Sequence, residues 1–274
     1  MPAYKKRFLY KAIDSILKQN YQDYELIIVN DASPEGLEDV IQQFHDERIR
    51  YEINHINIGR HDLIANWNHC IQFANNEYII LASDDDMFET DFLSKASMLI
   101  SKYPKVDIIR SGVKKIDEHD KILDYEFPMK EYMTSREYTL SYAKGMTISC
   151  VSNYVFKKKA LNNIGGFIPF PHAHYSDDAT VLTLTLNGIA CISTNEMNFR
   201  MSKSNLSNSW PENPKSLLNI TAQFLNPVYI HVMCGKGKWS LGRGLSIYRH
   251  LVKYFIKMAG IWDELCKKKP GYCI

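Results

Sequence analysis

The chain lacks the cysteine patterns that would indicate a disulfide framework or a structural zinc site. Its six cysteines are scattered, with no C-x-x-C pair and no other spacing typical of metal ligands. Most of them therefore fit buried thiols of a protein in a reducing compartment.

The sequence also has no large excess of one charge and no long apolar run. No basic stretch precedes an apolar leader, and no apolar run is long enough to cross a bilayer. The net charge of +2 points to neither a nucleic acid nor a strongly acidic partner. We therefore expect a cytoplasmic protein that does not bind nucleic acid.

The first half of the chain alternates between two kinds of apolar pattern. Hydrophobic residues make up 45% of the 274 residues, enough to build one large domain or one domain with an extension. Short apolar runs at 26–29 and 78–83 and an alternating strand pattern at 49–53 are separated by stripes at helical spacing. Repeated β-α-β units predict a mainly parallel sheet with helices on both faces.

Carboxylates follow two of these predicted strands directly. Asp31 comes after residues 26–29, and Asp84, Asp85 and Asp86 come after residues 78–83. Parallel sheets bind ligands at the carboxyl ends of their strands. Three adjacent carboxylates repel one another, so a divalent cation carrying a substrate phosphate would suit them. The alternative is a solvated acidic turn that leads into the next helix; the position of Asp31 favours the binding site.

The second half has a less regular pattern, and its composition changes towards the end. It predicts an extended hairpin at 113–127, a glycine turn at 165–167 and a helix at 178–186. A polar linker at 207–214 precedes two helical segments. The second of these, at 245–258, is basic and amphipathic. Such a helix either packs on its own domain or makes a peripheral contact with the inner face of an anionic membrane.

Six short motifs occur in a fixed order along the chain. They are P-A-Y at 2–4, the segment from SILKQNY to VNDAS at 15–33, N-I-G at 57–59, N-W-N at 66–68, S-D-D-D at 83–86, and G-G-F at 165–167 followed by Asp177 and Asp178. Each motif alone is weak, but six in order are specific. Together they resemble glycosyltransferase family 2, whose members are inverting enzymes with a GT-A fold.

The resemblance implies the fold and the domain boundaries. It implies an α/β GT-A domain over residues 1–206 with a mostly parallel central sheet. Residues 1–112 would form its nucleotide-binding half and residues 113–206 its acceptor-side half. Residues 207–274 would form a helical C-terminal extension.

The resemblance also implies roles for particular residues. Asp178 would be the general base that deprotonates the acceptor hydroxyl. Asp85 would bind Mn²⁺ or Mg²⁺, with Asp86 close enough to be a ligand as well. The implied substrate contacts are Pro2, Ala3, Tyr4 stacked on the base, Asp31 on the uracil N3–H, Asn68, Asp84 on the ribose, and Asp177. His174 flanks the Asp177–Asp178 pair in the sequence and is a further candidate for binding the acceptor or a phosphate. Asp177 and Asp178 could instead only cap the helix that follows them.

The function implied is metal-dependent sugar transfer in cell-surface polysaccharide synthesis. The donor would be a nucleotide-sugar, most simply a UDP-sugar, and the acceptor a glycan or a lipid-linked molecule. One alternative is a nucleotidyltransferase that makes sugar nucleotides, although no glycine precedes Gly36 to form the loop of that class. Another is a catalytically impaired module that binds a sugar or a nucleotide.

The chain departs from the family pattern in three places. Family members have an apolar central strand before the P-A-Y position, whereas this sequence opens at Met1 and Pro2. We therefore expect the first strand to be missing, through a start placed too late or a truncation, which would expose two ladder edges. Ser83 stands where the first acid of D-x-D-D is usual, and Asp177 replaces a glutamate.

Overall fold

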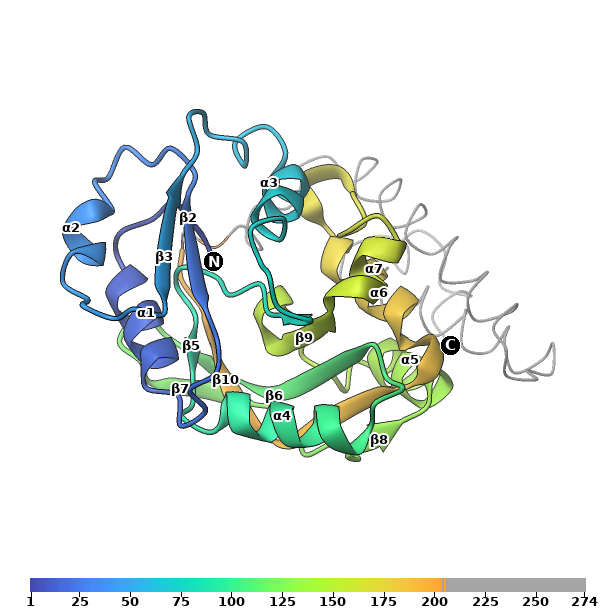
Figure 1. Cartoon of the computed structure of the whole chain (residues 1–274). Helices are drawn as coiled ribbons and strands as arrows, with labels where there is room; N and C mark the ends of the chain where they lie inside the picture. The colour runs from blue at the N-terminus through green and yellow to red at the C-terminus, as the bar shows by residue number, and fades with distance from the viewer. Residues whose placement is uncertain (204, 206–274) are drawn as a thin grey trace, which may run out of the picture.

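The computed structural model describes residues 1–203 and 205 (Figure 1). Strands and helices alternate strictly up to residue 79, as predicted for the first half of the chain. The strands are β1 (Pro2–Ala3), β2 (Leu26–Asn30), β3 (Ile49–Ile53), β4 (Tyr78–Ile79), β5 (Met87–Phe88), β6 (Ile108–Ile116), β7 (Ile122–Tyr125), β8 (Tyr132–Met133), β9 (Tyr154–Lys157) and β10 (Ile189–Arg200). The α-helices are α1 (Leu9–Leu17), α2 (Glu38–Ile41), α3 (Leu63–Cys70), α4 (Phe92–Lys102), α5 (Ser135–Ala143), α6 (Lys158–Asn163) and α7 (Ser176–Leu184). Short 3₁₀ turns are η1 (Val151–Asn153), η2 (Pro171–Ala173) and η3 (Thr185–Asn187).

The strands form two sheets. One is wholly parallel, in the order β1-β2-β3. The other runs β4-β9-β6-β10-β5, with β7 added to β6 and β8 added to β10. Its long central pair, β6 and β10, is parallel, while the remaining pairs are antiparallel. The predicted α/β class is confirmed, and the predicted hairpin at 113–127 is the β6–β7 pair.

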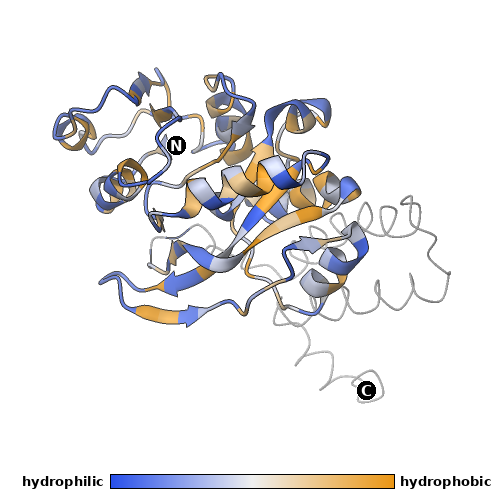
Figure 2. Ribbon diagram, turned by 60° about the horizontal axis from the view of Figure 1, so that its bottom comes forward, coloured by the Kyte–Doolittle hydropathy of each residue, from blue (hydrophilic) through white to orange (hydrophobic). Residues whose placement is uncertain are grey.

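Helices cover both faces of the sheets because strand side chains alternate in direction. Ile27 and Val29 of β2 enter one hydrophobic cluster, and their neighbours Leu26 and Ile28 enter the other. The first cluster includes side chains of α3, α5 and α7, and the second includes those of α1 and α4. Figure 2 shows the hydrophobic residues gathered in the strands beneath these helices.

The first three residues take part in the parallel sheet. The Met1 ammonium donates to the Ile27 carbonyl at 2.7 Å, and Val29 N–H donates to the Met1 carbonyl at 2.9 Å. A strand of two residues therefore lies where the family resemblance implies a longer one. Among the described residues β4 pairs only with β9, so β1 and β4 are not hydrogen-bonded to each other and belong to separate sheets.

The strand before the triple aspartate is shorter than the sequence predicts. It ends at Ile79 rather than at Ser83, although Leu81 and Ala82 are buried. With a single hydrogen-bonded neighbour, β4 has no second ladder to extend it. The prediction of a regular strand over 78–83 was wrong, but the burial of this apolar run was right.

The predicted helical extension at 207–274, with its basic helix at 245–258, lies outside the described residues. Within residues 1–203 and 205, no helix is both long and apolar enough to cross a membrane.

Candidate active site

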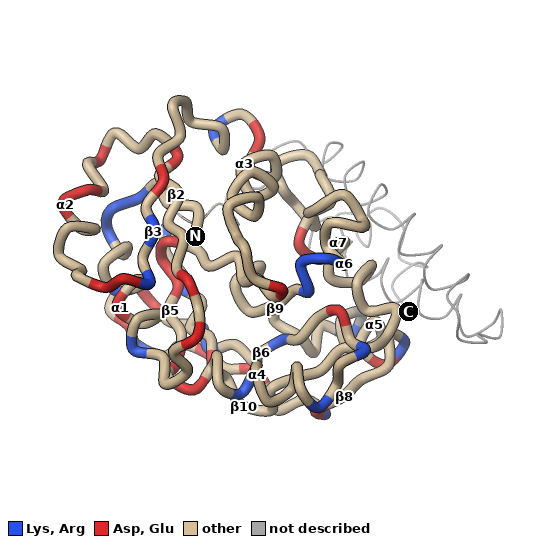
Figure 3. Tube along the Cα trace, in the orientation of Figure 1, with Lys and Arg blue, Asp and Glu red and all other residues tan. Residues whose placement is uncertain are grey.

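The N-terminal motif and the triple aspartate meet in space. Asp84 Oδ2 accepts hydrogen bonds from the backbone N–H groups of Tyr4 and Lys5, both at 2.8 Å. Tyr4 lies directly after β1, and its side chain is 39% exposed. The tyrosine ring is therefore available to a ligand at this edge, as base stacking would require. Figure 3 shows acidic segments beside β5 and the N-terminus.

Asp31 lies at the carboxyl end of β2 and is almost fully buried. Its Oδ1 accepts from Asn54 Nδ2 at 2.8 Å and from Ile58 N–H at 2.9 Å, and its Oδ2 accepts from Gly59 N–H at 2.7 Å. A Cβ at Gly59 would lie 2.8 Å from Oδ2, so only glycine fits there. A carboxylate has about four acceptor positions. Asp31 therefore fixes the N-I-G loop and retains one position for the predicted uracil contact.

Asp86 is held by protein groups, whereas Asp85 is more open. Asp86 is 2% exposed and accepts from Arg200 N–H and from Ser152 Oγ, each at 3.0 Å. Asp85 is partly exposed, and only its backbone carbonyl accepts from the Arg200 guanidinium, at 2.8 Å. Of the two predicted metal ligands, Asp85 is thus the one with a carboxylate available.

Burial and mutual repulsion raise the pKa values of these acids. Burial and the charge of Asp84 raise the pKa of Asp85 to about 6, although Lys5 and Arg200 oppose the rise. Burial and the charge of Asp85 raise the pKa of Asp86 to about 8. Burial also raises the pKa of Asp84. A site whose carboxylates repel one another in this way is stabilised by a cation.

Arg200 hydrogen-bonds the triple-aspartate loop. The sequence alone did not indicate this residue. Its side chain is fully buried at the end of β10, with the guanidinium 4.3 Å from the centre of the Phe8 ring. It donates to the carbonyls of Asp85 and Asp117 and to the carboxylate of Asp120. The acidic loop is therefore joined to the turn between β6 and β7.

Asp177 and Asp178 lie in the first turn of α7. Asp177 Oδ1 accepts from Asp178 N–H at 3.0 Å, which satisfies one of the free amides of the helix start. The hydroxyls of Ser149 and Tyr142 hydrogen-bond the Asp178 carboxyl. Its Oδ1 is buried and accepts no hydrogen bond from the described residues. Burial, followed by the charge of Asp177, raises the pKa of Asp178 to about 8.

The backbone before α7 is strained. His172, Ala173 and Tyr175 all have positive φ angles, of 57°, 60° and 65°. Such conformations cost non-glycine residues energy and occur where the surrounding structure enforces them. His174 lies within this segment, partly buried, with its ring centre 6.3 Å from that of His172. The predicted substrate contact of His174 stays a prediction.

One segment joins the two acidic groups. Ser149 bonds Asp178, Ser152 bonds Asp86, and the Cys150 thiol lies within electrostatic range of both Asp86 and Asp177. Ser152 Oγ also hydrogen-bonds Ser83 at 2.9 Å. Neither serine is marked in the sequence, because residues 149–153 carry no recognisable motif. One short segment therefore contacts both the triple aspartate and the Asp177–Asp178 pair.

The side-chain amide of Asn68 binds the G-G-F turn. Its Oδ1 accepts from Phe167 N–H at 2.7 Å, and its Nδ2 donates to the Phe167 carbonyl at 3.1 Å. Both ends of the amide are thus used on the G-G-F turn, which leads towards α7. Asn68 therefore fixes this turn, and its predicted substrate contact stays a prediction.

The two glycines of the turn allow a matched stability test. Both have positive φ, of +87° at Gly165 and +92° at Gly166, but a Cβ would meet open space at Gly165 and Asn68 at Gly166. We expect Gly165→Ala to cost about 1–3 kcal/mol of unfolding free energy from backbone strain alone. Gly166→Ala should cost clearly more in urea denaturation, because it also displaces Asn68. Equal costs would argue against the Asn68 contact.

Residues 1–165 match the family described as glycosyl transferase family 2. The chain belongs to this family.

Curated relatives cover different shares of the chain. EpsE of Bacillus subtilis (strain 168), named as a candidate glycosyltransferase, is 31% identical over 116 residues, which is 41% of each chain. TuaG of the same strain, named as a candidate teichuronic acid biosynthesis glycosyltransferase, is 25% identical over 219 residues, covering 76% of this chain and 81% of TuaG. The match therefore spans about two fifths of EpsE and most of TuaG.

The solved structure of S. aureus TarS 1-349 in complex with UDP-GlcNAc superposes with a TM-score of 0.71 at 13% identity. The superposition covers 93% of this chain and 71% of the TarS chain. At this identity the likeness concerns the fold, and it confirms the predicted GT-A architecture.

Proposed function

We propose that this family 2 chain is a metal-dependent inverting glycosyltransferase. It moves a sugar from a nucleotide-sugar, most simply a UDP-sugar, to a glycan or lipid-linked acceptor in cell-surface polysaccharide synthesis. The observation that carries the proposal is the junction at Ser149–Ser152, which joins the triple aspartate to the Asp177–Asp178 pair. The names of TuaG and of the TarS complex support the pathway and the UDP donor respectively.

In this proposal the nucleotide-sugar donor binds beside strand β1. Tyr4 offers an exposed ring for the base, Asp31 one acceptor position for its N–H, and Asp84 a carboxylate beside the Pro2–Ala3 strand for the ribose. These contacts orient the nucleotide so that its diphosphate lies towards Asp85. Pro2 and Ala3 contribute by fixing the backbone on which Tyr4 is placed.

The residues fit a divalent cation bound together with the diphosphate. No three acidic, histidine or cysteine side chains of the described residues form a complete metal cage. Mg²⁺ is usually held by one or two carboxylates plus substrate phosphates, which suits Asp85 with Asp86 behind it. A bound Mn²⁺ or Mg²⁺ would neutralise charge on the departing diphosphate.

Asp178 performs the proton transfer in this proposal. Its unbonded Oδ1 accepts the proton of the acceptor hydroxyl, whose oxygen attacks the anomeric carbon. The bond between that carbon and the diphosphate breaks on the opposite side, and the configuration inverts. A pKa near 8 suits a base that works around neutral pH.

UDP binding with and without Mn²⁺ tests the donor half. We expect UDP affinity, measured by calorimetry, to rise at least tenfold on adding Mn²⁺, and Asp85→Asn to lose this gain. Asp124→Asn on the exposed strand β7 is the matched control and should keep it. Metal-independent UDP binding by the unmodified chain would overturn the metal assignment.

A further inference from the structure

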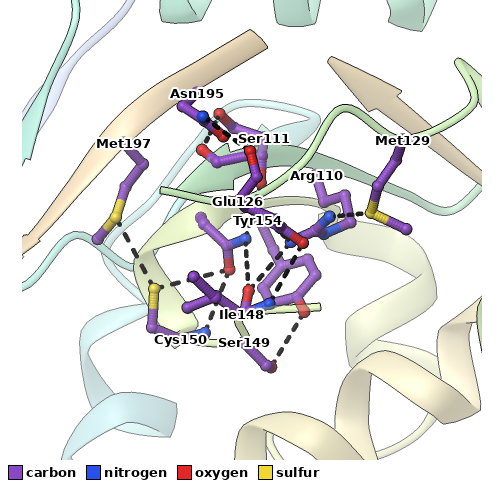
Figure 4. A network of polar contacts seen from close by, with 12 residues as sticks. Arg110, Ser111, Glu126, Met129, Ile148, Ser149, Cys150, Tyr154, Asn195 and Met197 are labelled. Atoms are coloured by element: carbon purple, nitrogen blue, oxygen red, sulfur yellow. Dashed lines mark hydrogen bonds and ion pairs between the residues drawn. The ribbon is translucent and has the colours of Figure 1, made fainter. Parts of the chain in front are cut away.

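Ser149 lies at the edge of a polar network built around the buried residues Arg110, Glu126 and Tyr154 (Figure 4). Tyr154 donates from its hydroxyl to Ser149 Oγ at 3.0 Å, and Tyr138 and Tyr154 exchange a hydrogen bond of 2.8 Å. Both tyrosines are fully buried. Serine has one O–H donor, and here it is used on the Asp178 carboxyl. The donors therefore run in one direction, from Tyr138 through Tyr154 and Ser149 to Asp178.

The backbone next to Ser149 is held at both the N–H and the carbonyl of Ile148. Ile148 N–H donates to Glu126 Oε1 at 3.2 Å, and the Ile148 carbonyl accepts from Arg110 Nη2 at 3.0 Å. Arg110 and Glu126 form an ion pair of 2.8 Å in which both side chains are buried (Figure 4). A buried pair that also binds the neighbouring peptide leaves Ser149 little freedom to move.

The hydrogen bonds to Asp178 fall on one side of its carboxyl group. Ser149 and Tyr142 supply hydroxyls, while Oδ1 has no partner among the described residues. The two hydroxyls therefore bond Oδ2. This arrangement turns Oδ1 away from the network and fixes the plane of the carboxylate.

We propose that Ser149 is a positioning residue that orients Asp178 and stabilises its ionised form. This inference rests on the proposed function in that it takes Asp178 as the base. A hydroxyl that donates to a carboxylate favours the charged form, which is the form that accepts a proton. The family assignment and the comparisons give Ser149 no such role.

The groups that face Asp178 are few among the described residues. Asp177 opposes its ionisation from the same helix. Tyr142 and Tyr138 face it from α5, and Ser149 faces it from the joining segment. Tyr154 of β9 contacts Ser149 and so lies one step further away. Arg110 of β6 acts on the two buried tyrosines and so supports the network at longer range.

Titration of the Asp178 carboxyl tests the inference without a substrate. Infrared difference spectra between each protein and its Asp178→Asn counterpart isolate this carboxyl from Asp86. We expect Ser149→Ala to raise the titration midpoint by about one pH unit, since a hydrogen bond to the charged form is lost. Ser149→Thr should restore the midpoint of the unmodified protein. Thr183→Ala, which lies on α7 together with Asp178, should leave the midpoint unchanged.

Tyr154→Phe provides a second variant that removes the donor behind Ser149. We expect a smaller rise in the same direction. An unchanged midpoint in Ser149→Ala and Tyr154→Phe would overturn the inference, even if Asp178→Asn abolishes transfer. A shifted midpoint together with an active Asp178→Asn enzyme would uphold the Ser149 contact and overturn the base assignment instead.

Discussion

Asp178→Asn is expected to lower kcat for sugar transfer by about 10²–10⁴-fold, the contribution typical of a general base. The amide keeps the shape of the side chain but cannot accept the acceptor proton at Oδ1, where no protein group is bonded. The measurement is UDP release from the donor sugar in the presence of Mn²⁺ and acceptor. UDP affinity should stay the same, because Asp178 belongs to the acceptor side.

Controls separate this result from a loss of structure. Asp124→Asn, an exposed change on β7, should keep full activity. An Asp178→Asn enzyme with unchanged kcat would remove the base assignment. Loss of UDP binding together with activity would show that the substitution disturbs the donor half as well.

The pH dependence gives an independent check on the same variant. Burial and Asp177 raise the pKa of Asp178 to about 8, so the folded state holds its proton more tightly than the unfolded chain. The resulting stability is fully present below about pH 4 and is lost as pH rises through about 8. Asp178→Asn should therefore be at least as stable as the unmodified protein at pH 8. The kcat/KM of the unmodified enzyme should rise as pH increases towards about 8, because a larger fraction of Asp178 is then ionised.

Glu126→Ala is expected to lower the free energy of unfolding by about 3–5 kcal/mol. The substitution leaves the Arg110 guanidinium buried without its counter-charge, in a position where both side chains are almost completely shielded from water. It also removes the acceptor of Ile148 N–H. Urea denaturation followed by circular dichroism measures the change.

Two further variants identify the source of this loss. Replacing both partners, Arg110→Met with Glu126→Leu, removes the unpaired charge and should cost less than Glu126→Ala alone. Lys18→Ala breaks the exposed pair with Asp14 and should change stability little, because water screens that pair. A double variant less stable than Glu126→Ala would show that the packing of the pair matters more than its charge.

The functional segments of this chain differ in how far the sequence could predict them. The α/β class and the strands at 26–29 and 49–53 followed from hydrophobic spacing. The placement of Asp31 directly after β2 followed from the same pattern, whereas β4 ends at Ile79, before Asp84 is reached. The contact between Asn68 and Phe167 could not be predicted, because the two residues lie 99 positions apart and no local pattern connects them.

What the sequence determined by itself was which residues are buried along each element and which acids follow the strands. Such patterns are local, since they depend on side chains a few positions apart. Only the tertiary structure decided that Ser149 and Ser152 join Asp178 to Asp86, that Arg200 fixes the acidic loop, and that Asp85 rather than Asp86 is open. Those contacts join residues distant in the chain, and burying their polar groups requires partners that only the folded arrangement supplies.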